Sequence, residues 1–164
     1  MQKKICLLGS FAVGKSSLVR RFVESIFSDL YRTTVGVRIH KKTIDLDGQT
    51  LNLIIWDLAG EDEFVVLRTE YLRGASGCIL VADGTRRDTL DKAIDLHSRA
   101  RLALGDVPFV LALNKTDRVD DWVIDETALE ELAEQGWSII RTSAKSERGV
   151  EETFNRMAQR VACE

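Results

Sequence analysis

The chain has 164 residues, of which 45% are hydrophobic and 30% are charged, and its formal net charge is −3. This size and composition are typical of one globular domain with an ordinary hydrophobic core. The weak negative charge argues against nucleic acid or an anionic membrane as the main partner, and neither a signal-peptide pattern nor an apolar run of about 18 residues is present.

The first part of the chain predicts a strand, a helix and a hairpin, in that order. Lys3–Leu8 ends in an apolar run that predicts a buried strand, and Lys15 to about Glu24 has apolar side chains at helical spacing. A β-hairpin is expected from Val37–Leu46 and Leu51–Asp57, with the Asp47-Gly48 dipeptide as its turn.

Helices and strands alternate through the rest of the chain. The expected elements are a short helix over Phe64–Arg73, a strand over Gly77–Ala82, a helix over Asp88–Leu104, a strand over Phe109–Leu113, a helix over Glu126–Glu134, a strand over Trp137–Ile140 and a helix over Val150–Ala162. We therefore predict a single α/β domain over residues 1–164. Its six-stranded, mainly parallel sheet would have one antiparallel hairpin strand and helices on both faces.

A glycine-rich segment between the first strand and the first helix predicts a phosphate-binding loop. It reads Gly9-Ser10-Phe11-Ala12-Val13-Gly14-Lys15-Ser16, which has the spacing G-x-x-x-x-G-K-S. The glycines let backbone N–H groups surround phosphate oxygens, and the following helix adds its positive N-terminal end. Lys15 would reach the β and γ phosphates, and the Ser16 hydroxyl would bind Mg²⁺. The segment therefore predicts a nucleoside triphosphate site without specifying the base.

The base is indicated by Asn114-Lys115-Thr116-Asp117, which follows a predicted buried strand. A carboxylate at Asp117 can accept two N–H donors from guanine, whereas adenine presents a mismatched edge that would leave the acid unpaired. Asn114 would tie this loop to the phosphate loop, and the stem of Lys115 could lie along the flat base. The two motifs together predict a guanine nucleotide.

These two motifs and three further segments resemble the Ras superfamily of small guanine-nucleotide-binding switches, and within it the Rab branch. The further segments are Tyr31–Gly36, Trp56–Gly60 and Thr142–Lys145, and the resemblance covers nearly the whole chain. It implies a P-loop GTPase fold and a protein that binds Mg-GTP or GDP, hydrolyses GTP slowly, and acts in signal transduction or vesicle traffic.

The resemblance also implies roles for three residues near the phosphates. Thr34 would complete the Mg²⁺ coordination only while a γ-phosphate is present, Asp57 would hold the ion through a water, and the Gly60 N–H would meet the γ-phosphate. Two loops held by one phosphate and one ion, and released when the phosphate is lost, make a two-state switch.

The expected site residues surround the whole nucleotide. Phe27 would lie against the base, or else serve as a core residue after the first helix, and the Ala144 N–H would contact the guanine oxygen. The expected nucleotide-binding residues are Gly9, Ala12, Val13, Gly14, Lys15, Ser16, Ser17, Phe27, Tyr31, Thr34, Gly60, Asn114, Lys115, Asp117, Ser143, Ala144 and Lys145, with Ser16, Thr34 and Asp57 as metal ligands.

Two residues depart from the family pattern. Glu61 replaces the glutamine that orients the attacking water in most members, and a carboxylate cannot donate a hydrogen bond to the γ-phosphate. Glu61 could act as a base, or it could simply hinder the reaction. Phe11 would block the approach of an activator's arginine, or else fold outward. With Glu61, Lys15, Thr34 and Gly60 as the expected catalytic residues, we predict slow hydrolysis and a weak response to an arginine-supplying activator.

Partners are expected from the resemblance alone. Effectors, exchange factors and activators would bind the switch loops beside an apolar triad of Ile39, Trp56 and Tyr71, although Ile39 and Trp56 could instead serve only hairpin packing. The ending Val161-Ala162-Cys163-Glu164 is no prenylation signal, so these residues support neither a lipid anchor nor membrane association. Either a prenylated tail is missing from this sequence or the protein works without a lipid anchor. We expect a cytoplasmic monomer that does not bind nucleic acid.

Three alternatives remain open at the level of sequence. Glu61 and Phe11 could have abolished catalysis, which would leave a GTP-binding interaction module that does not hydrolyse. The chain could also be a Ras-like domain of a larger protein. A P-loop phosphotransferase is disfavoured because the chain lacks an arginine-rich lid segment and its base loop favours guanine.

Overall fold

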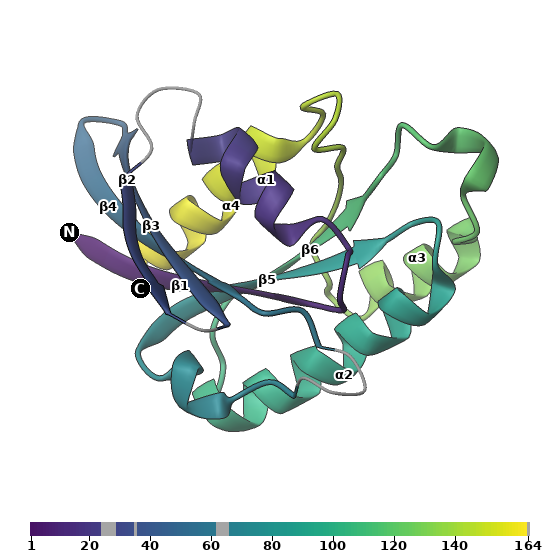
Figure 1. Ribbon diagram of the computed structural model, residues 1–164, viewed down its shortest axis with the longest axis horizontal. Coiled ribbons are helices and arrows are strands. Elements are labelled where there is room, and N and C mark those ends of the chain that lie inside the picture. Colours follow the sequence, from purple (N-terminus) through teal and green to yellow (C-terminus); the bar gives the residue numbers. More distant parts are fainter. Residues whose placement is uncertain (24–28, 35, 62–65, 164) are drawn as a thin grey trace.

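The computed structural model describes residues 1–23, 29–34, 36–61 and 66–163, in which one sheet lies between two layers of helices (Figure 1). The strands are β1 (Gln2–Gly9), β2 (Asp29–Thr34), β3 (Val37–Leu46), β4 (Gln49–Leu58), β5 (Ala75–Asp83), β6 (Phe109–Asn114) and β7 (Ile139–Arg141). The helices are α1 (Lys15–Val23), α2 (Arg87–Leu104), α3 (Glu126–Glu134) and α4 (Val150–Ala162), with 3-10 turns η1 (Thr69–Leu72) and η2 (Val119–Asp121).

The described strands form a single sheet in the order β2-β3-β4-β1-β5-β6-β7. The five strands from β4 to β7 in this order pair in parallel, whereas β3 is antiparallel to both β2 and β4. The α/β class, the mainly parallel sheet and the six predicted strands are confirmed. The edge strand β2 is a seventh that its sequence alone did not predict, because it forms by pairing with the free edge of β3.

Helices cover both faces of the sheet because the central strands are apolar on both sides. Ile5 and Leu7 of β1 belong to one core cluster with α1 and α4, and Cys6 and Leu8 belong to another with α2 and α3. Alternate residues of a strand point to opposite faces, so one buried strand supplies both cores. This arrangement confirms the predicted helices on both faces and leaves the carboxyl ends of the parallel strands at one edge.

Local chemistry sets several element boundaries. The predicted hairpin turn is confirmed, since Asp47 and Gly48 both have positive φ angles of 51° and 86°, as a tight turn of this kind requires. The helix α3 begins after Asp125, whose Oδ1 accepts a hydrogen bond of 2.9 Å from the Ala128 N–H. The observed bounds of α3 and α4 match the predicted ones.

Two predictions of secondary structure are wrong in detail. Within the described part of Phe64–Arg73, residues 66–68 are not helical and only η1 follows. The Leu67 N–H donates to the Glu61 carboxylate instead of a helical carbonyl. The last strand begins at Ile139 rather than Trp137, because the Trp137 N–H donates to the Leu132 carbonyl at the end of α3.

The predicted end of the first helix, Glu24, lies outside the described residues, and α1 reaches Val23. None of the helices in the described ranges combines the length and the apolar character that crossing a lipid bilayer demands.

Candidate nucleotide-binding site

The phosphate loop connects β1 to α1 at the carboxyl edge of the sheet. Its backbone is left-handed at Ala12, with φ 63°, and at Gly14, with φ 97°. Gly14 also has no room for a side chain, because a Cβ there would lie 2.4 Å from Asn114 Nδ2. The motif glycine is thus required both by its backbone angle and by the close approach of a second loop.

The hydroxyl and the carboxylate expected to hold a metal ion lie together. Ser16 Oγ donates a hydrogen bond of 2.5 Å to Asp57 Oδ2, which joins the start of α1 to β4. Asp57 Oδ1 is buried and has no hydrogen-bond partner among the described residues. Hydroxyl and carboxylate oxygens are the ligands that Mg²⁺ prefers, so this pair, with one unpaired buried oxygen, fits that ion.

Lys15 lies beside this pair with only 6% of its surface exposed. Burial lowers the pKa of its ammonium, and the nearby charge of Asp57 acts in the opposite direction. A largely desolvated cation attracts anions more strongly than a solvated one. The position therefore suits the phosphate contact expected from the motif.

The loop after β6 is tied directly to the phosphate loop. Asn114 Nδ2 donates to the Val13 carbonyl at 2.9 Å, while Thr142 Oγ1 donates to Asn114 Oδ1 at 3.1 Å. Lys115 has a φ of 70°, and its ammonium donates to the Ala12 carbonyl at 3.1 Å. These bonds confirm the expected link between Asn114 and the phosphate loop.

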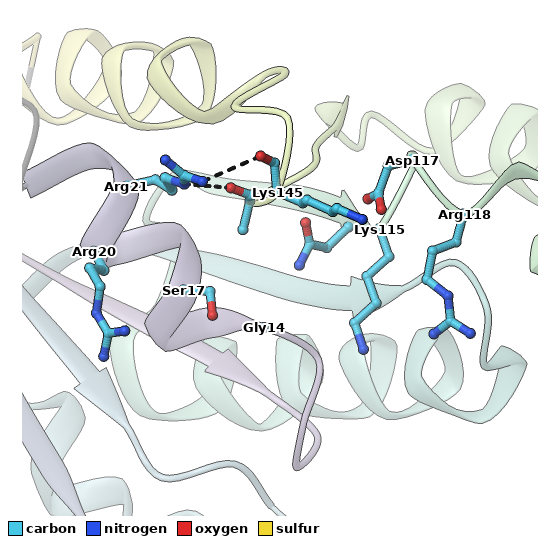
Figure 2. A pocket seen from close by; sticks show the side chains of 10 residues that line it. Gly14, Ser17, Arg20, Arg21, Lys115, Asp117, Arg118 and Lys145 are labelled. Carbon is cyan, nitrogen blue, oxygen red and sulfur yellow. Dashed lines mark hydrogen bonds between the residues drawn. The ribbon is translucent and has the colours of Figure 1, made fainter.

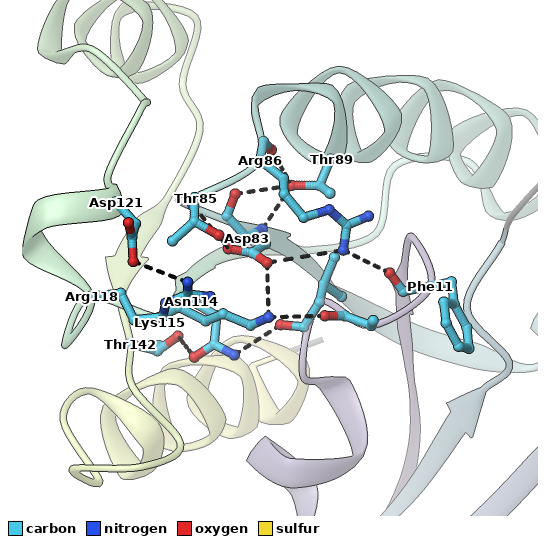
Figure 3. A network of polar contacts seen from close by, with 12 residues as sticks. Phe11, Asp83, Thr85, Arg86, Thr89, Asn114, Lys115, Arg118, Asp121 and Thr142 are labelled. Carbon is cyan, nitrogen blue, oxygen red and sulfur yellow. Dashed lines mark hydrogen bonds and ion pairs between the residues drawn. The ribbon is translucent and has the colours of Figure 1, made fainter.

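A buried carboxylate beneath this junction was missed by sequence reasoning. Asp83 is fully buried at the end of β5, and its Oδ2 lies 2.9 Å from Lys115 Nζ and 4.0 Å from Arg86 Nη1. Arg86 also donates to the Phe11 carbonyl at 3.0 Å (Figure 3). Asp83 thus holds two cations that each bond a carbonyl of the phosphate loop.

The pKa of Asp83 reflects these contacts. Burial alone would raise the pKa of this carboxyl, but hydrogen bonds from Lys115 and from the Thr85 hydroxyl and N–H lower it below its usual value. The signal that could have found Asp83 is its place at the carboxyl end of a strand next to β1, where ligands of such sheets bind.

A cavity of about 530 Å³ opens between these loops (Figure 2). Its lining residues are Gly14, Ser17, Arg20, Arg21, Asn114, Lys115, Asp117, Arg118, Ala144 and Lys145. The volume is in the range of small-molecule sites. One cavity is therefore lined by segments that are far apart in the sequence and that were predicted to bind phosphate and base.

Hydrogen bonds order the wall of the cavity that contains Asp117. Ser143 Oγ donates to Asp117 Oδ1 at 2.8 Å, which brings the loop after β7 to the loop after β6. Arg21 Nε donates to the Ala144 carbonyl at 2.7 Å, and Arg21 Nη1 lies 3.0 Å from Glu147 Oε1. Sequence reasoning missed Arg21, although its place one turn after Ser17 on α1 is the signal that could have found it.

Glu61 does not line the cavity. Its side chain is 7% exposed and pairs with Arg99 and Lys92 of α2. Burial alone would raise the pKa of Glu61, but hydrogen bonds from Arg99, the Leu67 N–H and Lys92 lower it to about 2. The predicted catalytic carboxylate is therefore ionised and held by α2.

Phe11 is 64% exposed, which is compatible with both alternatives, so the expected block of an activator's arginine stays a prediction. Among the expected apolar triad, Ile39 is buried at 6% exposure, whereas Trp56 and Tyr71 are half-buried with ring centroids 6.4 Å apart. The described surface thus offers two members of the triad, because Ile39 packs in the core.

The remaining expected residues are placed only in part. Tyr31 and Thr34 belong to β2, for which the backbone alone is described, and Thr34 pairs with Val37 of β3. Phe27 lies outside the described residues. Their expected contacts with base and metal remain predictions.

Comparison with known proteins agrees with this geometry. The family model described as "Ras family" matches residues 4–163. The chain is also similar to "Ras-related protein Rab-1D" of Dictyostelium discoideum, with 40% identity over 160 residues that span 96% of this chain and 78% of the relative.

Proposed function

We propose that the cavity beside the phosphate loop holds the guanosine. The premise is that the chain belongs to the Ras family and is therefore a guanine-nucleotide-binding switch that hydrolyses GTP. The observation that supports this most is the convergence of the phosphate loop, Asn114–Asp117 and Ser143–Lys145 on that cavity. Asp117 would accept the two guanine N–H donors, with Ser143 orienting its carboxylate. The other residues that the sequence predicts to contact the nucleotide complete this proposal.

The test is a change of base preference. We expect Asp117→Asn to bind xanthosine diphosphate better than guanosine diphosphate, because the amide offers a donor where the carboxylate only accepted. Calorimetric titration of the full chain with both nucleotides measures the change. Asp120→Asn, in η2 and outside the cavity lining, is the matched control and should keep the guanine preference. If Asp117→Asn keeps it too, the assignment of the base site is wrong.

We further propose that Mg²⁺ is held by Ser16 and Asp57, with Thr34 added in the triphosphate state. The support is the 2.5 Å contact between the Ser16 hydroxyl and Asp57, and the buried Asp57 Oδ1 without a described partner. When bound, the ion would neutralise charge on the phosphate oxygens. The chain's own contribution is to fix these oxygen ligands at the joined ends of α1 and β4.

Hydrolysis is proposed to be slow, with Lys15, Gly60, Thr34 and Glu61 as the residues nearest to the chemistry. A carboxylate with a pKa of about 2 is a weak base, and it has no hydrogen to donate to a phosphate oxygen. Glu61 is also committed to Arg99 and Lys92. These contacts support a low intrinsic rate.

Members of this family act through effectors, exchange factors and activators. For this chain we propose that the half-buried pair of Trp56 and Tyr71 forms part of that contact surface, since exposed apolar groups mark partner sites. We also propose a monomeric, cytoplasmic protein whose residues 1–164 form one domain, with a role in signal transduction or vesicle traffic.

A further inference from the structure

Glu61 is held by α2 through a cluster of charge-assisted hydrogen bonds. Arg99 donates through both terminal nitrogens, from Nη1 to Oε2 at 2.9 Å and from Nη2 to Oε1 at 2.5 Å. Lys92 Nζ donates to Oε1 at 3.2 Å, and the Leu67 N–H donates to Oε2 at 2.8 Å. Lys92 and Arg99 lie two turns apart on one face of α2, which allows both to reach one carboxylate. The two-pronged Arg99 contact fixes the direction of the carboxylate as well as its charge.

The backbone of the same residue is bonded to the phosphate loop. The Glu61 N–H donates to the Gly9 carbonyl at 3.0 Å, and the Phe11 N–H donates to the Glu61 carbonyl at 3.1 Å. Gly60 packs directly on the loop, because a Cβ there would lie 2.7 Å from Phe11 Cα. The carbonyl of Phe11 in turn accepts a hydrogen bond from Arg86 (Figure 3). One residue thus joins α2 to the loop that binds phosphate.

This connection occupies part of the loop that is proposed to bind phosphate. Loop N–H groups bind phosphate oxygens only when they are free, and the N–H of Phe11 is occupied by the Glu61 carbonyl. A triphosphate carries more charge and needs more donors than a diphosphate, so it competes more strongly for this segment of the loop. A ligand shifts a conformational equilibrium only by its differential affinity for the two states. The hold of α2 on Glu61 opposes that shift.

We propose that Arg99, assisted by Lys92, is a positioning residue that sets the preference for nucleoside diphosphate over triphosphate by holding Glu61 against α2 and the phosphate loop. The inference rests on the proposed nucleotide site. Arg99 acts through Glu61 rather than through contact with the nucleotide, since its terminal nitrogens bond to Glu61 and Asp95 and it does not line the cavity. Removing the Arg99 side chain should therefore change the ratio of the affinity for triphosphate to the affinity for diphosphate.

The experiment measures equilibrium affinities of the full chain for fluorescent GDP and for a non-hydrolysable GTP analogue, both with Mg²⁺. We expect Arg99→Ala to shift the ratio toward triphosphate by about tenfold, within the usual range of coupling between sites. Lys92→Ala, which removes one partly exposed partner, should shift it less, and Glu61→Gln should shift it in the same direction. The double variant Arg99→Ala with Glu61→Gln should not exceed the larger single effect, because both substitutions break one cluster.

Arg101→Ala is the matched control, because this arginine lies on the same helix but pairs with exposed Asp106 at 3.7 Å. It should leave the ratio unchanged. Two results would overturn the inference while leaving the nucleotide site intact. In one, Arg99→Ala and Lys92→Ala change the affinities for GDP and for the GTP analogue equally. In the other, the ratio of these affinities stays unchanged in Arg99→Ala, Lys92→Ala and Glu61→Gln. A wild-type chain that binds neither nucleotide would instead refute the proposed function, and the inference with it.

Discussion

The side-chain amide of Asn114 donates a hydrogen bond of 2.9 Å to the main-chain carbonyl of Val13, which joins two loops 101 residues apart in the sequence. The bond is buried, and its acceptor belongs to the loop whose N–H groups are proposed to bind the phosphates. A fixed carbonyl on one side of a peptide fixes the N–H on the other, because the peptide unit is planar. The base loop therefore helps to preset the phosphate loop.

We predict that Asn114→Ala destabilises the protein even without nucleotide. The Val13 carbonyl and the Thr142 hydroxyl would each lose a buried partner, which costs about 1–3 kcal/mol. Urea unfolding of the nucleotide-free chain measures this. The control Asn52→Ala removes an amide whose Oδ1 accepts from Thr43 at an exposed position. Equal losses of unfolding free energy in the two variants would show that the buried bond contributes no more stability than the exposed one.

A second prediction separates a steric from a conformational need for glycine. Gly14 and Gly48 both have positive φ angles, of 97° and 86°, but only Gly14 faces a neighbour where a Cβ would lie. Alanine at either position should cost about 1 kcal/mol of stability from backbone strain. Gly14→Ala should in addition displace Asn114 and weaken GDP binding by about tenfold or more, which corresponds to at least about 1.4 kcal/mol.

Titration calorimetry with GDP and thermal unfolding of both variants provide the two measurements. If Gly48→Ala weakens GDP binding as much as Gly14→Ala does, the close approach of Asn114 is not what the loop requires. The comparison is informative because the space around a Cβ at Gly48 is open within 4 Å.

The fold was predictable where local and tertiary signals agree. The bounds of α3 follow from the Asp125 cap and from Leu129 and Leu132, which occur at helical spacing and are buried. The helix predicted over Phe64–Arg73 is wrong at residues 66–68, where a side chain outside the segment, Glu61, accepts from the Leu67 N–H. No periodicity within a segment can show such a competitor.

The site was predictable to a similar degree. The phosphate loop and Asn114–Asp117 are continuous motifs with fixed spacing, so their convergence on one cavity followed from the parallel topology. Asp83, Arg86 and Arg99 were missed because each acts through a contact that is distant in sequence. The pairing of β5 with β1 brings Asp83 to the loop, and the packing of α2 against the sheet brings Arg99 to Glu61.

The ionised state of Glu61 predicts a pH dependence of stability. Its folded pKa of about 2 lies below the ordinary value of 4.5, so the folded state favours the charged form. The stabilisation is fully present above about pH 4.5 and is lost as the pH falls toward about 2. We expect it to be about 1–2 kcal/mol, because solvent screens the partly exposed Arg99 and Lys92.

The measurement is the difference in unfolding free energy between wild type and Glu61→Gln from pH 6 downward. This difference should shrink as acid is added, whereas it should show no comparable change for Glu130→Gln, an exposed side chain on α3. A Glu61→Gln difference that stays constant down to the acid limit of folding would contradict the charged cluster.

The last prediction concerns the rate of hydrolysis. Glu61→Gln should release phosphate from bound GTP faster than wild type, by about tenfold or more, because an amide can both accept from water and donate to a phosphate oxygen. The neutral side chain would also be held less firmly by Arg99. Single-turnover phosphate release with GTP and Mg²⁺ measures the rate.

Glu61→Ala is the control that separates these two causes. It frees Arg99 as fully as the glutamine variant but supplies no group to orient water, so it should remain as slow as wild type. Acceleration by alanine equal to that by glutamine would mean that the contact with α2, and not the missing amide, limits the reaction. A wild-type rate already equal to that of activator-stimulated relatives would refute slow hydrolysis itself. Neither the charge of Glu61 nor its contact with α2 would then matter for the chemical step.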